Sequence, residues 1–203
     1  MNEHPEPERI VPFLIRTGAL KFGEFTLKSG AKAPFFIDMG EVKTGHDLEI
    51  IGEHLALALE KIFPGTTLVF GPAYKGIVLA IAAATAAWRI SGRNISVLFD
   101  RKEKKTHGES GSFIGSTPRP EDRVVIVDDV LTSGRTKLDA IQGLKTAFGT
   151  ASADVLVVVD RTTRNTARTL PVHALTDLPG LFTFLQMHDD IRWKIIKEFW
   201  EKA

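Results

Sequence analysis

Residues 124–136 read VVIVDDVLTSGRT, and this stretch decides the fold of the chain. The β-branched side chains up to Val127 form a continuous apolar run, which is typical of a central strand covered on both faces. We therefore expect a buried strand over residues 123–127. Two adjacent carboxylates, Asp128 and Asp129, follow where that strand leaves the core.

The residues after the strand have the composition of a phosphate-binding loop. Backbone N–H groups at the start of a helix carry partial positive charge and lack partners within the helix, and Gly134 allows the backbone to close around an anion. The loop also supplies hydroxyl donors from Thr132, Ser133 and Thr136. Asp128 and Asp129 would repel a phosphate, but they can accept hydrogen bonds from sugar hydroxyls or support a metal bound to them. An acidic turn before a capped helix would explain the two aspartates alone, whereas the whole pattern predicts a site for a ribose 5-phosphate.

Helical and strand patterns alternate along the rest of the chain. Residues 46–62 carry apolar side chains at helical spacing, and residues 67–70, 95–99 and 155–159 are short apolar runs typical of buried strands. This alternation implies right-handed crossovers and an α/β fold with a mostly parallel central sheet flanked by helices. Ligands bind beyond the carboxyl ends of the strands in such sheets. The glycine-rich and charged segments begin at those ends, at Gly71, Arg101, Asp128 and Asp160.

Further elements are expected on both sides of these strands. Residues 76–88 and 134–148 should be helices, the second with its apolar side chains directed inward: Leu138, Ile141, Leu144 and Phe148. The N-terminal region should hold a helix over residues 8–18 and short strands over residues 22–27 and 34–39. Residues 178–200 should form one or two helices. The polar stretch 101–115 has no periodicity and is predicted to be a long mobile loop.

Bulk composition excludes several classes of protein. The chain has 203 residues, which suits one domain with a full core, and 26 basic against 25 acidic side chains give a net charge of +1. A non-specific nucleic-acid binder usually carries a clear basic excess. The absence of cysteine excludes disulfides, cysteine-based zinc sites and a thiol nucleophile. Without a secretory signal or an apolar run of membrane-spanning length, we expect a cytoplasmic protein.

The stretch 124–136 resembles the phosphoribosyl pyrophosphate (PRPP) signature of the type I phosphoribosyltransferases. The resemblance implies that family's α/β fold in a single domain over residues 1–203. A small hood would comprise residues 1–40 with the C-terminal part, a core would span about residues 45–165, and a flexible catalytic loop would follow Arg101. It also implies that the signature residues bind PRPP: Asp128, Asp129, Val130, Leu131, Thr132, Ser133, Gly134, Arg135 and Thr136.

Other segments resemble the orotate phosphoribosyltransferases in particular. Residues 21–30 read KFGEFTLKSG and are followed by PFFIDM. The resemblance implies that Lys28 contacts PRPP and that Phe36, with Ile37 beside it, packs on orotate. Residues 70–77 read FGPAYKGI, and here the resemblance places Tyr74 and Lys75 on the ribose diphosphate.

The polar loop and the end of a later strand carry the most specific resemblance. Residues 101–109 read RKEKKTHGE, which is similar to the catalytic loop of these enzymes. The similarity implies diphosphate contacts from Arg101, Lys102, Lys105 and His107, and a homodimer in which residues 101–115 reach the neighbouring subunit's site. Residues 157–161 read VVVDR. An arginine can grip a planar carboxylate with two parallel hydrogen bonds, and the resemblance places Arg161 and Thr132 on orotate.

The implied reaction transfers ribose 5-phosphate from PRPP to orotate. The products would be orotidine 5′-phosphate and pyrophosphate, in the de novo synthesis of UMP. Mg²⁺ would be held mainly through PRPP. The implied catalytic residues are Lys105, His107, Asp128 and Asp129, and either Lys105 or His107 would donate a proton to pyrophosphate.

Other functions remain open at this point. The same fold could serve a regulator that binds PRPP and nucleic acid without turnover, although the near-neutral charge argues against it. It could also serve a phosphoribosyltransferase for another base, against which Arg161 and the loop at 101–109 both argue. The chain is too short to include an orotidylate decarboxylase barrel, but such an enzyme could be a separate partner.

Overall fold

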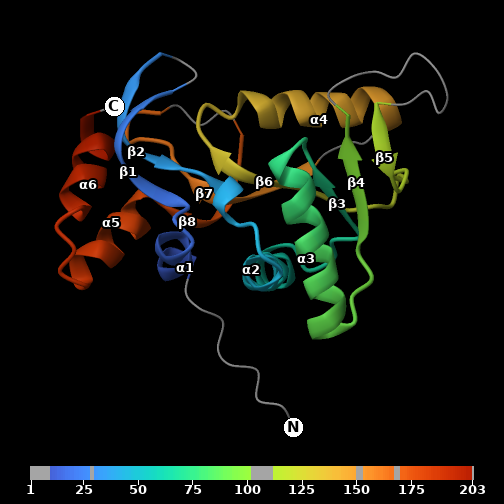
Figure 1. Ribbon diagram of the computed structural model, residues 1–203. Helices are drawn as coiled ribbons and strands as arrows, with labels where there is room; N and C mark the ends of the chain where they lie inside the picture. Colours follow the sequence, from blue (N-terminus) through green and yellow to red (C-terminus); the bar gives the residue numbers. More distant parts are fainter. Residues whose placement is uncertain (1–9, 28–29, 102–111, 150–152, 167–169, 203) are drawn as a thin grey trace, which may run out of the picture.

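The computed structural model describes residues 10–27, 30–101, 112–149, 153–166 and 170–202. Its centre is a sheet of order β5-β4-β3-β6-β7-β8, with helices on both faces (Figure 1). The strands of this sheet are β3 (Leu68–Gly71), β4 (Ser96–Asp100), β5 (Phe113–Gly115), β6 (Val124–Leu131), β7 (Ala153–Asp160) and β8 (His173–Asp177). All neighbouring strands are parallel except β5, which pairs antiparallel with β4. The predicted α/β fold with a mostly parallel sheet is confirmed.

Strand β6 is buried on both faces because successive side chains of a strand point to opposite sides. Val125 and Val127 belong to the core cluster formed with α2 (Gly45–Ile62) and α3 (Lys75–Ser91). Val124 and Ile126 belong to a second cluster that includes Leu144 of helix α4 (Arg135–Phe148). The β-branched run therefore has the two-sided environment that its composition predicts.

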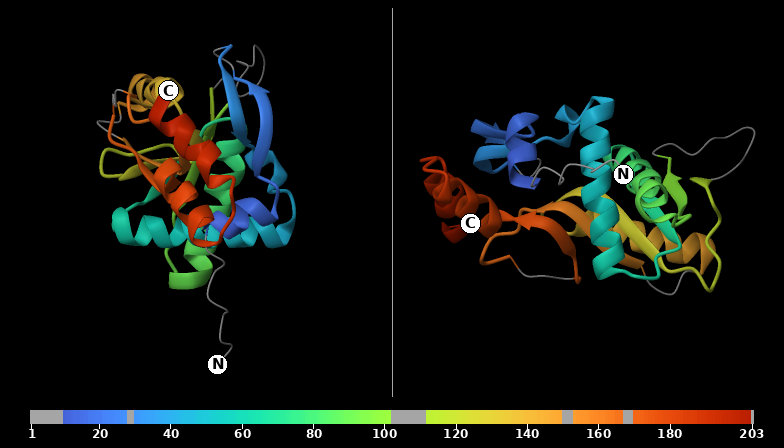
Figure 2. Two further views of the ribbon diagram at one scale, coloured as in Figure 1. Left: turned by 90° about the vertical axis from the view of Figure 1, so that its left-hand side faces the viewer. Right: turned by 90° about the horizontal axis from the view of Figure 1, so that it is seen from below.

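A second, smaller sheet lies beside the central one. Strands β1 (Leu20–Thr26) and β2 (Lys32–Ile37) form an antiparallel hairpin, preceded by α1 (Ile10–Arg16) and followed by the 3-10 turn η1 (Met39–Glu41). The C-terminal helices α5 (Leu178–Met187) and α6 (Trp193–Lys202) lie on the same side of the molecule (Figure 2). Phe35 of β2 meets Phe199 of α6 edge to face, with ring centroids 5.1 Å apart. The hairpin and the last helix thus pack together.

The structure corrects several predicted boundaries. Strand β6 runs to Leu131, so Asp128 and Asp129 belong to the strand rather than following it. Strands β5 and β8 were not predicted; β5 has only three residues and β8 is only partly buried, so neither carries a strong apolar pattern. In α4, Leu138 was expected to face inward but is 36% exposed, whereas the adjacent Lys137 is only 3% exposed.

No helix in the described part of the chain is both long enough and apolar enough to cross a membrane.

Helices α2 and α3 approach so closely at Gly52 that we predict a larger residue there is destabilising. A Cβ atom at Gly52 would lie 2.7 Å from the carbonyl oxygen of Ala82, and a backbone atom cannot move aside cheaply. We expect Gly52→Ala to lower the free energy of unfolding by about 1–3 kcal/mol, as overpacking does. Urea denaturation measures the change.

Gly45→Ala is the matched control on the same helix, because a Cβ atom at Gly45 meets nothing within 4 Å. Alanine favours the helix over glycine by up to about 1 kcal/mol, so this variant should be as stable as the wild type or slightly more stable. Equal effects of the two substitutions would contradict the close packing of α2 on α3.

Candidate active site

The turn between β3 and α3 lies at the carboxyl edge of the sheet. It contains Ala73 and Tyr74, joined by a cis peptide bond, and Tyr74 is 66% exposed. The carboxylate of Asp100, at the end of the neighbouring strand β4, accepts a hydrogen bond of 2.6 Å from the backbone N–H of Ala73. Asp100 therefore fixes the position of this turn, and sequence reasoning did not single it out.

The predicted phosphate loop lies between β6 and α4. Gly134 caps α4 in the left-handed conformation (φ 77°), and no side chain occupies the cap position. The next two residues, Arg135 and Thr136, begin the helix, so their N–H groups have no carbonyl within the helix to bind. Thr132 and Ser133 are exposed. The loop thus presents the backbone donors and hydroxyl groups that an anion requires.

Three signature residues have surroundings that limit what their side chains can do. Leu131 is buried in one core cluster, and the half-buried Val130 packs against the other, so both side chains contribute to packing. The guanidinium of Arg135 forms an exposed ion pair of 3.1 Å with Asp139 on α4. The Arg135 side chain is therefore paired on the protein surface rather than directed at the loop.

The two carboxylates of β6 have different environments. Asp128 forms an ion pair with Lys137, in which Oδ2 lies 2.6 Å from Nζ, and both side chains are largely buried. Asp129 lies 3.6 Å from the Nζ of Lys75. Burial, and next the negative charge of Asp128, raise the pKa of Asp129 above its ordinary value. Asp128 thus pairs closely with Lys137, whereas Lys75 lies farther from Asp129 and also contacts Asp38.

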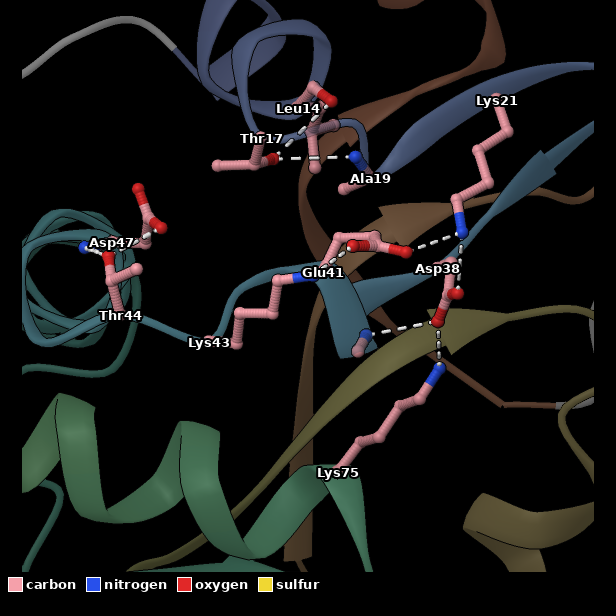
Figure 3. Close-up of polar contacts among 11 residues, drawn as sticks. Leu14, Thr17, Ala19, Lys21, Asp38, Glu41, Lys43, Thr44, Asp47 and Lys75 are labelled. Atoms are coloured by element: carbon pink, nitrogen blue, oxygen red, sulfur yellow. Dashed lines mark hydrogen bonds and ion pairs between the residues drawn. The ribbon is translucent and has the colours of Figure 1, made fainter.

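Lys75 connects this edge to the hairpin through a chain of ion pairs (Figure 3). Its Nζ donates to Asp38 Oδ1 at 3.0 Å, and Lys21 Nζ donates to the other oxygen of Asp38 at 3.0 Å and to Glu41 at 2.7 Å. Partial burial disfavours the charged form of Asp38, but the hydrogen bonds from Lys21, Lys75 and the N–H of Gly40 outweigh it and lower the pKa of Asp38 from 3.8 to about 2.

Arg161 lies at the end of β7, next to the phosphate loop. Its backbone N–H donates to the carbonyl of Leu131 at 2.9 Å, and the residue is only 8% exposed. The guanidinium carbon lies 5.8 Å from the ring centroid of Phe35 and 5.4 Å from that of Phe199. Burial lowers the pKa of Arg161. Within the described ranges its buried Nε has no acceptor, so a donor is available for a carboxylate.

The hairpin residues predicted to contact a planar ligand differ in exposure. Phe36 is half-buried and stacks on Phe25, with ring centroids 5.5 Å apart. Ile37 is 3% exposed and belongs to the core, so its side chain faces away from solvent. Of the predicted pair, Phe36 therefore has the more accessible side chain.

Four predicted PRPP contacts lie outside the described residues: Lys28, Lys102, Lys105 and His107. Arg101 is described, and its backbone N–H donates to the carbonyl of Ser112 at 2.8 Å. The buried Nε of Arg101 has no partner in the part of the chain that the structure describes.

Four residues of this region were missed from the sequence: Asp38, Asp100, Lys137 and Phe199. Asp38 and Asp100 each directly follow or end an apolar strand, and this placement was a usable signal because polar side chains at strand ends meet at one sheet edge. Phe199 carries no such signal, since its role depends on α6 packing against a strand far away in sequence.

Comparison with known proteins agrees with this geometry. A family model described as phosphoribosyl transferase domain matches residues 39–174. An orotate phosphoribosyltransferase of Salmonella arizonae is 34% identical over 98% of this chain and 98% of its own length. The enzyme of that name from an Enterobacter species is 41% identical over 79% of this chain and 74% of its own. The crystal structure of the Francisella tularensis orotate phosphoribosyltransferase superposes with a TM-score of 0.77 at 28% identity, covering 95% of this chain and 97% of that one.

The lowered pKa of Asp38 predicts how stability depends on pH. Because the folded pKa is about 2 against an ordinary value of 3.8, the ionised carboxylate stabilises the fold fully above about pH 4, and this contribution is lost as the pH falls through about 2. Asp38→Asn should therefore lower the free energy of unfolding by on the order of 1 kcal/mol near neutral pH, since its partners are partly exposed. Near pH 2 the two proteins should converge. Urea titrations across this pH range measure the difference.

The same substitution in a Lys21→Met background is the control. With one of the two cations removed, the pH-dependent difference should shrink. A difference between Asp38→Asn and wild type that stays constant from about pH 6 to about pH 2 would show that the carboxylate charge is not what stabilises the pairing.

Proposed function

Since this chain belongs to the phosphoribosyl transferase domain family and within it to the orotate phosphoribosyltransferases, we propose that the sheet edge described above carries out that reaction. Ribose 5-phosphate is transferred from PRPP to orotate, giving orotidine 5′-phosphate and pyrophosphate for UMP synthesis. The observation that supports it best is the placement of Arg161 beside the phosphate loop, through the hydrogen bond from its N–H to Leu131.

PRPP is proposed to lie across the carboxyl ends of β3 and β6. The N–H groups and hydroxyls of residues 132–136 bind its 5-phosphate at the start of α4. Asp128 and Asp129 accept hydrogen bonds from the ribose hydroxyls. Tyr74 and Lys75 contact the diphosphate, for which Lys75 leaves the carboxylates of Asp38 and Asp129 that it contacts in this structure.

Orotate is proposed to bind between the hairpin and Arg161. A guanidinium donates two parallel hydrogen bonds to a carboxylate, and orotate carries a carboxylate that uracil lacks. The hydroxyl of Thr132 adds a donor, and the half-buried ring of Phe36 packs on the pyrimidine plane. Selectivity for orotate would then come mainly from Arg161.

The proposed chemistry is a displacement at the anomeric carbon of the ribose. The orotate ring nitrogen loses its proton to solvent and forms the new bond to that carbon while the bond to the pyrophosphate oxygen breaks, through a transition state with oxocarbenium character. The cations of Arg101, Lys102, Lys105 and His107 stabilise the charge that develops on pyrophosphate. Either Lys105 or His107 donates a proton to it. A loop over the site excludes water, which would otherwise hydrolyse the sugar.

Mg²⁺ is proposed to enter with PRPP. Asp128 is already paired with Lys137, and Asp129 lies near Lys75, so these carboxylates would support Mg²⁺ indirectly and the metal would be held mainly through PRPP. Bound there, Mg²⁺ would neutralise charge on the leaving group. The aspartates would support it through its water shell and the ribose hydroxyls.

A homodimer is also proposed, and the outer face of α3 supports it. Tyr74, Val78, Ile81 and Trp88 lie along one stripe of the helix and are 66%, 44%, 46% and 62% exposed. Apolar side chains gathered on one face mark an interaction surface. Because the stripe begins at Tyr74, a partner seated on it would be close enough to extend its residues 101–115 into this site. A cytoplasmic location is part of the proposal, which the cysteine-free composition supports.

The assay that tests the function follows the loss of orotate absorbance with PRPP and Mg²⁺. Wild type should consume orotate, and should stop when EDTA removes the metal. Arg161→Lys keeps the charge but loses the planar fork, so its kcat/KM for orotate should fall roughly 100-fold while its KM for PRPP changes little. Lys105→Ala should slow turnover.

Arg164→Lys is the matched control, because Arg164 is exposed and lies three residues after Arg161; it should behave as wild type. If folded wild type binds PRPP but consumes no orotate, the enzyme assignment fails. A PRPP-binding regulator or a phosphoribosyltransferase for another base would then explain the site better.

The proposed dimer predicts that a charge on the α3 stripe disrupts both assembly and activity. Ile81→Asp should give monomers in sedimentation velocity and lose turnover, because the loop of the partner no longer completes the site. Ile90→Asp is the control: Ile90 is 45% exposed against 46% for Ile81, but it lies off the stripe. Mixing the slow Lys105→Ala variant with Asp129→Asn should raise activity above that of either variant alone, since one site of each mixed dimer is intact. An active Ile81→Asp monomer would refute the shared site.

A further inference from the structure

Two neighbouring residues of α4 have environments opposite to their chemistry. Leu138, an apolar residue, is 36% exposed, and Lys137, a charged one, is 3% exposed. Lysine is almost never fully buried unless it is paired. The contacts of Lys137 must therefore explain its burial.

The ammonium group of Lys137 reaches back from α4 to strand β6. It donates a hydrogen bond of 2.8 Å to the carbonyl oxygen of Val130 and forms an ion pair of 2.6 Å with Oδ2 of Asp128. Its own backbone N–H donates to the carbonyl of Gly134 at 3.0 Å. One side chain thus joins the strand before the phosphate loop to the helix after it.

Stability alone does not account for this pair. Taking two charges out of water removes most of what their attraction contributes, and well-packed apolar residues in place of a buried ion pair are often as stable or more so. The neighbouring Leu138 is apolar yet more exposed than Lys137, which is not the arrangement that apolar packing alone would favour. The contacts of Lys137 instead fix the positions of the Asp128 carboxylate and of Val130, where the phosphate loop begins.

We infer that Lys137 is a positioning residue for the phosphoribosyl pyrophosphate site. It holds the Asp128 carboxylate toward the ribose hydroxyls and closes the base of the phosphate loop at Val130. Lys137 touches no substrate itself, because its side chain is only 4% exposed. This inference rests on the proposed PRPP site but not on the identity of the base.

The ion pair also gives the two aspartates different surroundings. With Lys137 bound to it at 2.6 Å, the Asp128 carboxylate is held in a fixed orientation. Asp129 lies 3.6 Å from Lys75, which the diphosphate is proposed to attract, and the charge of Lys137 acts on Asp129 as well. Without Lys137 both carboxylates would lose that positive charge, and repulsion between them would favour Asp128 turning away from the ribose hydroxyls.

Lys137→Met tests the inference, because methionine keeps the length and apolar stem of lysine without the ammonium group. Binding of PRPP with Mg²⁺ is measured by calorimetry in the absence of orotate, and KM values for PRPP and orotate are measured in turnover. We expect the Kd and KM for PRPP to rise about tenfold, as expected for losing hydrogen bonds to a charged group, and the KM for orotate to stay unchanged. Lys145→Met, at an exposed position of the same helix, should match wild type in all three.

A purely structural role would give a different result: a lower free energy of unfolding with unchanged KM values. Wild-type affinity of Lys137→Met for PRPP overturns the inference. If wild type binds PRPP but consumes no orotate, the proposed function fails while the comparison of PRPP affinities still decides the role of Lys137.

A second comparison covers the case in which Lys137→Met does not fold. Asp128→Asn and Asp128→Asn with Lys137→Met both lack the buried negative charge, so the double variant contains no unpaired carboxylate at this position. If Lys137 acts mainly through Asp128, adding Lys137→Met should weaken PRPP binding far less than tenfold beyond Asp128→Asn. A full further tenfold loss would overturn that mechanism.

Discussion

Strand β6 is covered by α2 and α3 on one face and by α4 on the other, so it can carry charged side chains only where it leaves the core. Asp128 and Asp129 stand at that point, within the last residues of the strand. Because β3, β6 and β7 are parallel, the ends of all three meet at one edge. Lys75, which begins the helix after β3, and Arg161, which follows β7, are brought to the same place for the same reason.

Charges at this edge are paired before any substrate arrives. Lys137 binds Asp128, Lys75 binds Asp38 and lies near Asp129, and Lys21 joins Asp38 to Glu41. A chain of alternating charges gives each of these carboxylates a neighbouring cation. It also holds the Lys75 ammonium near the proposed diphosphate site, and a diphosphate carries more negative charge than the carboxylates that Lys75 contacts here. The hairpin is part of this chain, so its position is coupled to that of Lys75.

Sequence patterns predicted the buried strands because burial on both faces leaves a continuous β-branched run, as in residues 124–127. They predicted the phosphate loop because glycine and hydroxyl residues are needed where a backbone closes on an anion. They misplaced the end of β6, since aspartate is typical of loops and only the pairing with β7 holds Asp128 in a strand. They placed Leu138 inward and did not single out Lys137, because helical periodicity cannot foresee a buried acceptor on another element. Asp38 and Phe199 escaped notice because their partners are distant in sequence.

The C-terminal segment, which carries no motif, completes the surroundings of Arg161, the arginine proposed to bind orotate. Phe199 of α6 and Phe35 of β2 meet edge to face, and the guanidinium of Arg161 lies near both rings. Aromatic faces attract a guanidinium without taking up its N–H donors. Arg161 can therefore be held in place and kept out of water while its Nε has no acceptor among the described residues. A carboxylate that reaches this arginine finds a donor already oriented and desolvated, which strengthens the hydrogen bond it can form. Under the role proposed for Arg161, packing of the hairpin against α6 is a condition for recognising orotate.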